Sequence, residues 1–294
     1  MTNLCEEYLL SHSVEEAVQV LSAANGSARL LSGGSDLLLE LQQGVLPPVK
    51  LLVDVTEIGE MCALETQKEG LYIGAAVTLT RLAKSSLIWE HAQALGDAAA
   101  LMANPQVCNV ATIGGNVAHA LPAADGTIAL LALDAQAEIA DPSGRRRVPL
   151  QALFKGPGKS ALDPCRDLLV GFYLPLKEKG QASAFTRRVN PQGIALALLN
   201  VAMWLQREGE RVEDIRIAAG PSGPIPNRMK KTEEIMREQL PAPQLLEQAS
   251  VALLEEAHFR TSLHRATADY RQHLAGVLLN EAFITAWNRA GSGL

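Results

Sequence analysis

The spacing of apolar and polar residues predicts helices and strands in alternation at the start of the chain. Ser13 and Glu16 have the spacing of a capping box, and apolar residues on one helical face follow them, so we expect a helix over 13–24. Ala28–Leu31 then has the pattern of a buried strand, and the turn Gly33–Asp36 leads into a leucine-rich helix. This order is typical of an α/β unit.

The next segments combine extended and helical periods. A β-branched run at 50–55 predicts a strand, and 64–79 divides at Lys68–Gly70 into the two halves of a hairpin. Apolar residues then recur with a helical period from Ile88 to Met102, which predicts one helix of about fifteen residues before Pro105. Residues 104–111 have neither period, so we expect a loop there.

Strand patterns return further along the chain. Residues 135–150 predict a hairpin that turns at Asp141–Gly144, and 167–174 predict a further strand. Between these elements, Phe154–Lys159 is a glycine-rich loop without Walker spacing. A short helix is expected from Asp125 to Leu133, with the Asp125 carboxylate as its cap.

The last part of the chain changes from strands to helices. Residues 195–206 and 214–219 are strand-like and predict an antiparallel pair, whereas helical patterns dominate from Lys230 and include a long terminal element at 266–289. We therefore expect two small α/β subdomains and a C-terminal α+β domain. Their predicted bounds are 1–55, 56–178 and 179–294.

Composition narrows the class of protein. Of the 294 residues, 48% are hydrophobic, as in a globular chain, and only 4% are aromatic, which leaves little material for stacking on bases. The 26 basic and 32 acidic residues give a formal charge of −6, so nucleic acid is not an expected partner. The basic run Arg145–Arg147 follows a turn and is interpreted as the solvated side of a hairpin.

The cysteines are widely separated, and none belongs to a C-x-x-C pair. They are Cys5, Cys62, Cys108 and Cys165. This spacing predicts reduced structural thiols and no zinc or iron–sulfur ligation. Glu6 and Glu7 stand where a signal peptide would be basic, and no run of about 18 apolar residues occurs, so we expect a cytoplasmic protein without a membrane span.

Two glycine-rich stretches are candidates for ligand binding. Glycine lacks a Cβ atom, so Gly33-Gly34 and Gly114-Gly115 can bring backbone N–H groups against a ligand, and a phosphate suits such a nest. A helix beginning at the first turn would add a favourable dipole. A tight turn that binds nothing explains the first pair equally well, and this pair lacks the G-x-G-x-x-G spacing.

In their order and spacing, these motifs resemble the flavin-binding medium subunits of molybdenum hydroxylases, such as xanthine dehydrogenases and bacterial carbon monoxide dehydrogenases. The resemblance covers nearly the whole chain. It rests on Ser32–Asp36, Ile73–Ala75, Thr112–Asn116 with Pro122 and Asp125, Phe154–Lys159, Ser183–Phe185 and Asp269–Leu274.

The resemblance implies a PCMH-type FAD-binding unit formed by the first two subdomains, followed by an antiparallel sheet backed by helices. The first implied cofactor loop, which would cradle the FAD pyrophosphate, is Leu31, Ser32, Gly33, Gly34, Ser35 and Asp36. The second implied loop is Thr112, Ile113, Gly114, Gly115 and Asn116. Asp125 would meet the ribityl or nearby hydroxyls, and His119 would face the cofactor unless it is structural.

The resemblance also implies a role in electron transfer. A molybdopterin-binding large subunit would hydroxylate the substrate, a 2Fe-2S small subunit would pass electrons on, and FAD in this chain would deliver them to NAD⁺, oxygen or a quinone. A dimer of heterotrimers is the implied assembly, and this chain needs no catalytic acid or base and no metal ligand. The Gly156–Lys159 loop and Ala111-Thr112 favour the xanthine-dehydrogenase-like branch, while purine, aldehyde, carbon monoxide and N-heterocycle substrates stay open.

Some residues depart from the family pattern. Cys108 stands where arginine is common, Ala111 replaces a usual glycine, Thr186 replaces a lysine, and Gly193 lies where an acidic residue is frequent. These changes bear on the flavin potential and on a nicotinamide site. They also keep open a flavin-free assembly or scaffold subunit, whereas a stand-alone flavin oxidase has no candidate residue for covalent flavin attachment or for a substrate base.

Overall fold

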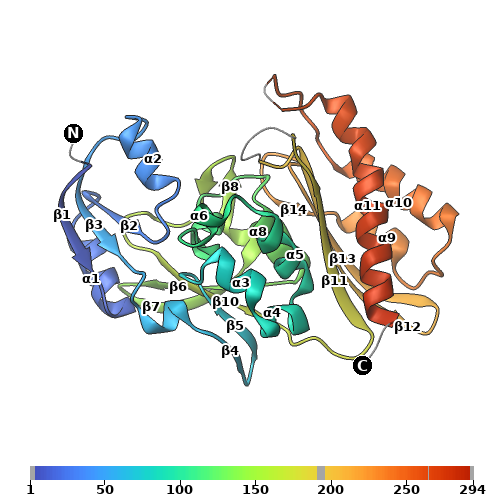
Figure 1. Cartoon of the computed structure of the whole chain (residues 1–294), viewed down its shortest axis with the longest axis horizontal. Coiled ribbons are helices and arrows are strands. Elements are labelled where there is room, and N and C mark those ends of the chain that lie inside the picture. Colours follow the sequence, from blue (N-terminus) through green and yellow to red (C-terminus); the bar gives the residue numbers. More distant parts are fainter. Residues whose placement is uncertain (1–3, 191–195, 264, 292–294) are drawn as a thin grey trace.

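Three sheets of three or more strands follow one another along the chain in a computed structural model that describes residues 4–190, 196–263 and 265–291 (Figure 1). A three-stranded sheet belongs to the N-terminal part, a five-stranded sheet to the middle and a four-stranded sheet to the C-terminal part. Each predicted module therefore contains one of these sheets. The boundaries between the modules stay predictions.

The first sheet is parallel and has the strand order β1-β3-β2. Its elements are β1 (Cys5–Leu10), α1 (Val14–Ala23), β2 (Ala28–Leu31), α2 (Leu37–Gln42) and β3 (Val49–Asp54). The capping box is confirmed, because the Ser13 hydroxyl accepts the N–H of Glu16 at 3.1 Å. The apolar face of α1 is buried, as the pattern predicted, whereas β1 was not predicted.

The second sheet is antiparallel and has the order β4-β5-β10-β6-β7. Its strands are β4 (Leu64–Gln67), β5 (Gly70–Gly74), β6 (Gln136–Asp141), β7 (Gly144–Pro149) and β10 (Leu168–Leu174), and a small hairpin is formed by β8 (Phe154–Gly156) and β9 (Lys159–Ser160). Both predicted hairpins and the predicted strand at 167–174 are confirmed. The last of these, β10, lies at the centre of the sheet.

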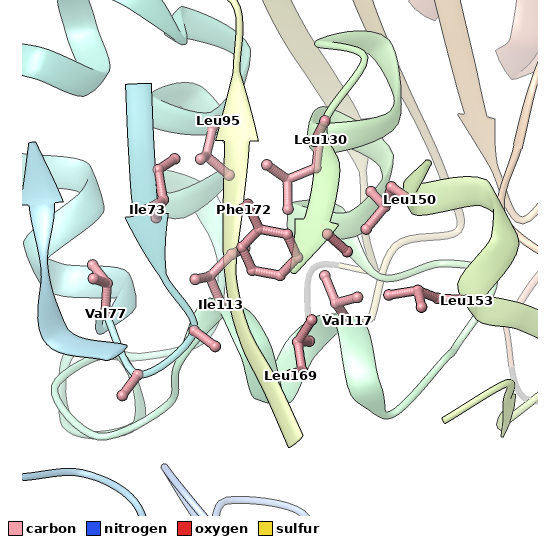
Figure 2. Packing of buried hydrophobic residues seen from close by; sticks show 14 of the residues in the cluster. Ile73, Val77, Leu95, Ile113, Val117, Leu130, Leu150, Leu153, Leu169 and Phe172 are labelled. Atoms are coloured by element: carbon pink, nitrogen blue, oxygen red, sulfur yellow. The ribbon is translucent and has the colours of Figure 1, made fainter. Parts of the chain in front are cut away.

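Short helices surround this sheet. They are η1 (Gly59–Cys62), α3 (Leu79–Lys84), α4 (Ser86–His91), α5 (Gln93–Leu101), α6 (Pro105–Cys108), α7 (Ile113–Ala118), α8 (Asp125–Ala132) and η2 (Leu150–Leu153). In the core, Phe172 of β10 lies among Ile113, Val117 and Leu130 from the helices (Figure 2). The burial of these residues fixes α7 and α8 against the sheet.

The single helix predicted over 88–102 is wrong. The helix breaks at Ala92, whose φ and ψ of −137° and 50° are not helical, and two helices result. The break allows the Ser183 hydroxyl of the next domain to accept the N–H of Ala94 at 2.9 Å. A tertiary contact therefore overrides a continuous apolar period.

The predicted loop at 104–111 is also partly wrong, because it contains α6. The side chain of Asn104 accepts the N–H of Val107 at 2.9 Å, and Pro105 occupies the first turn. Both are local helix-start signals, but the helix is a single turn and has no apolar period to reveal it.

The C-terminal sheet is antiparallel, with its strands in sequence order. The elements are β11 (Gln181–Arg188), β12 (Leu199–Glu208), β13 (Arg211–Gly220), β14 (Asn227–Arg228), α9 (Lys230–Met236), α10 (Pro243–Glu256) and α11 (Ala268–Gly291). The long helix α11 packs on β11 and β12, while α5 and α8 contact the sheet from the second module (Figure 1). The predicted strand at 195–206 begins outside the described residues, and β11 was not predicted.

The run Arg145–Arg147 lies on the solvated hairpin strand β7, as predicted. Arg145 pairs with Glu60 at 2.6 Å and with Glu15 of α1 at 2.9 Å. The run therefore has a structural role, since Arg145 joins the first module to the second.

Candidate functional site

The two glycine-rich stretches meet at a cavity of about 240 Å³. Most of its lining comes from three segments, which are the loop after β2, the residues around α7 and the start of β10, and single residues of other elements complete it. The lining residues are Leu30–Leu37, Val55, Met61, Ala75, Leu79, Ala111, Thr112, Gly114–Asn116, Ala118, His119, Leu162 and Asp167–Leu169. The sequence prediction that both stretches form one site is thus supported by their convergence.

The first loop presents a row of free backbone donors. Within the described residues, the N–H groups from Ser32 to Asp36 donate to no protein acceptor. Gly34 has a φ of +67°, a left-handed conformation that glycine adopts without strain and that turns the loop. Successive unpaired N–H groups in such a turn form a nest for an anionic oxygen.

The helix that follows this loop contributes little to the attraction of an anion. α2 has six residues, so its dipole is small, and the loop amides carry the attraction for an anion instead. The expected contribution of a helix N-terminus is therefore not the main feature of this site.

Gly33 and Gly114 are required for close packing between backbones. A Cβ atom on Gly33 would lie 2.3 Å from the carbonyl oxygen of Val110 and 2.7 Å from Cα of Ala111. A Cβ atom on Gly114 would lie 2.5 Å from Cβ of Ala75. The absence of side chains thus lets the walls of the cavity approach each other, which is a different role from the ligand contact expected from the sequence.

The second stretch is a helix and not a loop. Thr112 is the N-cap of α7, and its hydroxyl accepts the N–H of Gly115 at 3.2 Å. The N–H groups of Ile113 and Gly114 donate to the carbonyls of Val77 and Ala75 at 3.0 and 2.8 Å. The expectation that this stretch offers free amides is therefore wrong, because those amides already have protein acceptors.

Instead of free amides, α7 offers the hydroxyl of Thr112 and an exposed surface at Gly115. Thr112 Oγ1 lies 3.1 Å from Ser32 Oγ, so the two segments are joined by a hydrogen bond across the cavity. Gly115 is exposed, and a Cβ atom there would meet only Thr112 Oγ1, at 3.2 Å. The half-buried His119 follows α7 and lines the same cavity.

Two residues implied by the resemblance turn away from the cavity or serve the fold. Ile113 is fully buried in the core beside Phe172 and does not line the cavity (Figure 2). Asn116 lines the cavity, but its Oδ1 accepts the N–H of Thr127 at 3.0 Å and so caps α8.

Asp125 lies outside the cavity lining and is nearly buried, with 6% of its surface exposed. Its Oδ2 accepts from Arg187 Nη1 at 2.5 Å, and its Oδ1 accepts from Asn200 Nδ2 at 2.5 Å. Burial raises the pKa of this carboxyl, against the effects of Arg187 and Asn200. The predicted capping role is wrong, because the N-cap of α8 is Ala124, and contact with a cofactor hydroxyl stays a prediction.

Sequence reasoning missed the third wall of the cavity. Asp167 precedes β10 and accepts from Arg146 Nη2 at 3.0 Å and from the N–H of Asp163 at 2.8 Å, so its charge is compensated. Leu162 and Leu169 add apolar surface beside it. An acid before a buried strand was visible in the sequence, but apolar lining residues have the same pattern as core residues.

The described residues that depart from the family pattern have packing roles. The buried Cys108 thiol donates to the carbonyl of Met102 at 3.0 Å, and burial raises its pKa. Ala111 lies against Gly33, and the Thr186 hydroxyl donates to the carbonyl of Leu278 at 3.2 Å. Gly193 lies outside the described residues.

Other kinds of site receive no support within the described residues. No group of three or more His, Cys, Asp or Glu side chains there is arranged to hold a metal ion. Within the same residues, no helix combines the length and apolar character needed to cross a bilayer. The four cysteines are free thiols.

Two family profiles together match most of the chain. The family described as "FAD binding domain in molybdopterin dehydrogenase" matches residues 4–177. The family described as "CO dehydrogenase flavoprotein C-terminal domain" matches residues 185–286.

Individual relatives align over nearly their whole length. The chain is 30% identical to the xanthine dehydrogenase FAD-binding subunit of Escherichia coli O157:H7, with 98% of each chain covered. It is 29% identical to the carbon monoxide dehydrogenase medium chain of Hydrogenophaga pseudoflava, with 96% and 97% covered. A solved structure of the Hydrogenophaga pseudoflava carbon monoxide dehydrogenase aligns with a TM-score of 0.92 at 28% identity, over 98% of this chain and 99% of that one.

Proposed function

The chain belongs to the FAD-binding medium subunits of molybdenum hydroxylases, the xanthine and carbon monoxide dehydrogenase family, and from this premise we propose how it holds FAD and what it does with it. In this proposal FAD lies between the first glycine loop and α7, and the subunit passes electrons from a partner to an acceptor. The free N–H groups from Ser32 to Asp36 are the observation that carries the binding site.

The donors of the first loop suit the diphosphate of FAD. A diphosphate bears two negative charges on oxygens that accept several hydrogen bonds, and consecutive amides satisfy them without a metal or a basic side chain. The Ser32 and Ser35 hydroxyls would add donors in the same turn if they left their present partners, Thr112 Oγ1 and Asp36 Oδ2. The exposed Asp36 carboxylate is an acceptor suited to ribose or ribityl hydroxyls next to the diphosphate.

The opposite wall suits the uncharged parts of the cofactor. Gly115 and Ala118 present a side-chain-poor surface of α7, and Met61, Leu162 and Leu169 present apolar side chains. The cavity is smaller than the 300–1,000 Å³ of typical ligand sites, so FAD would extend beyond it along the loop. Apolar walls of this kind suit a flat ring, and a few polar groups are enough to fix its orientation.

Asp125 fits the proposed site only if FAD binding exposes its carboxylate. The carboxylate is held by Arg187 and Asn200 of the C-terminal domain. Contact between Asp125 and the ribityl chain would need the buried carboxylate to become accessible from the cavity, because Asp125 is 6% exposed and does not line it. Absorbance-detected FAD titration of Asp125→Asn would then show weaker binding, whereas unchanged affinity would leave Asp125 with the domain contact alone.

FAD, when bound, supplies two-electron redox chemistry that the side chains of this chain do not supply. The residues of the site bind and orient the flavin and exclude water from one face. No acid or base at the site is required, because proton and hydroxyl transfer to substrate belong to the molybdenum subunit in this proposal.

The proposed assembly contains further chains. The relatives are called a "FAD-binding subunit" and a "medium chain", names that place each in a larger complex. We infer that this chain joins a molybdopterin-binding large subunit and a 2Fe-2S small subunit in a cytoplasmic dimer of heterotrimers. NAD⁺, oxygen or a quinone would receive the electrons, and the complex would be xanthine-dehydrogenase-like.

One experiment tests both the binding site and the electron path. The chain is purified alone and with co-expressed partners, and its flavin spectrum is followed while the reduced iron–sulfur partner is mixed with it. We expect bleaching of the flavin absorbance on mixing and its return when an acceptor is added. A complex that assembles and turns over substrate without flavin in this chain would indicate the scaffold alternative.

A further inference from the structure

Arg271 is a buried cation, and no carboxylate pairs with it in the part of the chain that the structure describes. It lies in the first turn of α11 and is only 2% exposed. Within the described residues, its guanidinium takes part in no ion pair or hydrogen bond, and its Nε is buried without an acceptor. A buried charge of this kind destabilises the fold unless an opposite charge compensates it.

The position of Arg271 follows from the helix period. Leu274, Ala275 and Leu278 share its face of α11 and are buried against the C-terminal sheet. An arginine at this position of an apolar stripe is unexpected, because an apolar side chain would be the stable choice. Packing alone therefore does not explain the arginine, whereas binding of an anionic ligand would.

The surrounding charges are also positive. Burial lowers the pKa of Arg271, and the positive charges of Arg265 and Arg260 lower it further. Both are exposed, and neither forms an ion pair with a carboxylate in the described part of the chain. The N-terminus of the 24-residue helix α11 adds a partial positive charge to the same place.

We propose that Arg271, together with the exposed Arg260 and Arg265, is a binding site for an oxyanion group. The planar guanidinium matches the two oxygens of a carboxylate or phosphate, and the two exposed arginines raise the local concentration of anions. The group has two possible sources, a free oxyanion such as phosphate or a carboxylate on a partner subunit. The site is separate from the cofactor cavity, because none of the three arginines lines that cavity.

Inorganic phosphate is the probe. Thermal unfolding of the FAD-saturated chain is followed in phosphate and in sodium chloride of equal ionic strength, so that the glycine loop is already occupied. We expect phosphate to raise Tm by at least about 2 °C and to saturate. Arg271→Met is expected to abolish the shift, and Arg265→Gln to raise the half-saturating concentration about fivefold.

Arg216→Met is the matched control, because it removes an arginine of the same domain that stacks on Trp204 at 4.0 Å. It should keep the phosphate response. The proposal is overturned if Arg271→Met is as stable as the wild type in every buffer and responds to phosphate equally. The source is identified in the assembled complex, where a partner carboxylate would suppress the phosphate response and a free-oxyanion site would retain it.

Discussion

Gly33→Ala tests whether the packing of the first loop against residues 110 and 111 positions the FAD site. The added Cβ would lie 2.3 Å from the Val110 carbonyl oxygen, about 1 Å inside ordinary contact, and the neighbour on that side is backbone. Neither side can yield by a simple rotamer change. The loop must therefore move away from α7, and the walls of the cavity separate.

The expected magnitude follows from the cost of overpacking. Such insertions cost about 1–3 kcal/mol. If the free energy of FAD binding falls by this amount, FAD affinity decreases about 5-fold to 150-fold, since each 1.4 kcal/mol is a factor of ten. The loss of stability is expected to lower Tm by several degrees while the chain remains folded.

The assay is a fluorescence titration of FAD into the apo chain, with circular dichroism as the measure of folding. Gly59→Ala is the matched control, because no heavy atom lies within 4 Å of the added Cβ. Its FAD affinity should equal that of the wild type. Wild-type affinity in a folded Gly33→Ala chain would refute the reasoning, because the close approach would then be irrelevant to the cofactor.

Three further substitutions have defined outcomes. Gly115→Trp places bulk on the exposed face of α7 and should abolish FAD retention with Tm nearly unchanged; equal flavin content would refute it. Arg146→Gln leaves the Asp167 carboxylate without its cationic partner in the proposed FAD site and should weaken FAD binding about fivefold in the same titration, less at high salt. Tyr8 donates to Asp54 at 2.6 Å, which raises its pKa to about 12, so wild-type stability should fall between pH 10 and 12 while Tyr8→Phe lacks this slope in denaturant titrations.

The sequence predicts those parts of the fold that are decided locally. Ser13 and the apolar face after it suffice to specify α1, and the turn at Asp141–Gly144 specifies a hairpin, because the signals lie within a few residues of each other. The break at Ala92 could not be predicted in this way. It depends on Ser183, which is 89 residues from Ala94 along the chain.

The candidate site was predictable as a set of segments but not as chemistry. The glycines identified the two walls, yet the sequence could not show that the amides of Gly114 and Ile113 already have acceptors in the 75–77 segment. Nor could it show that Asp125 pairs with Arg187 of the next domain. Which donors stay free depends on tertiary contacts, and those contacts leave the Ser32–Asp36 amides free for an anion.

The flavin content of the purified chain tests the account most directly. The chain is expressed, its folding is confirmed by circular dichroism, and the released cofactor is identified by chromatography after FAD has been added and the excess removed. We predict a yellow protein with close to one FAD per chain. A folded chain that shows no flavin absorbance and takes up no added FAD would contradict the proposed site and the electron-transfer role that depends on it.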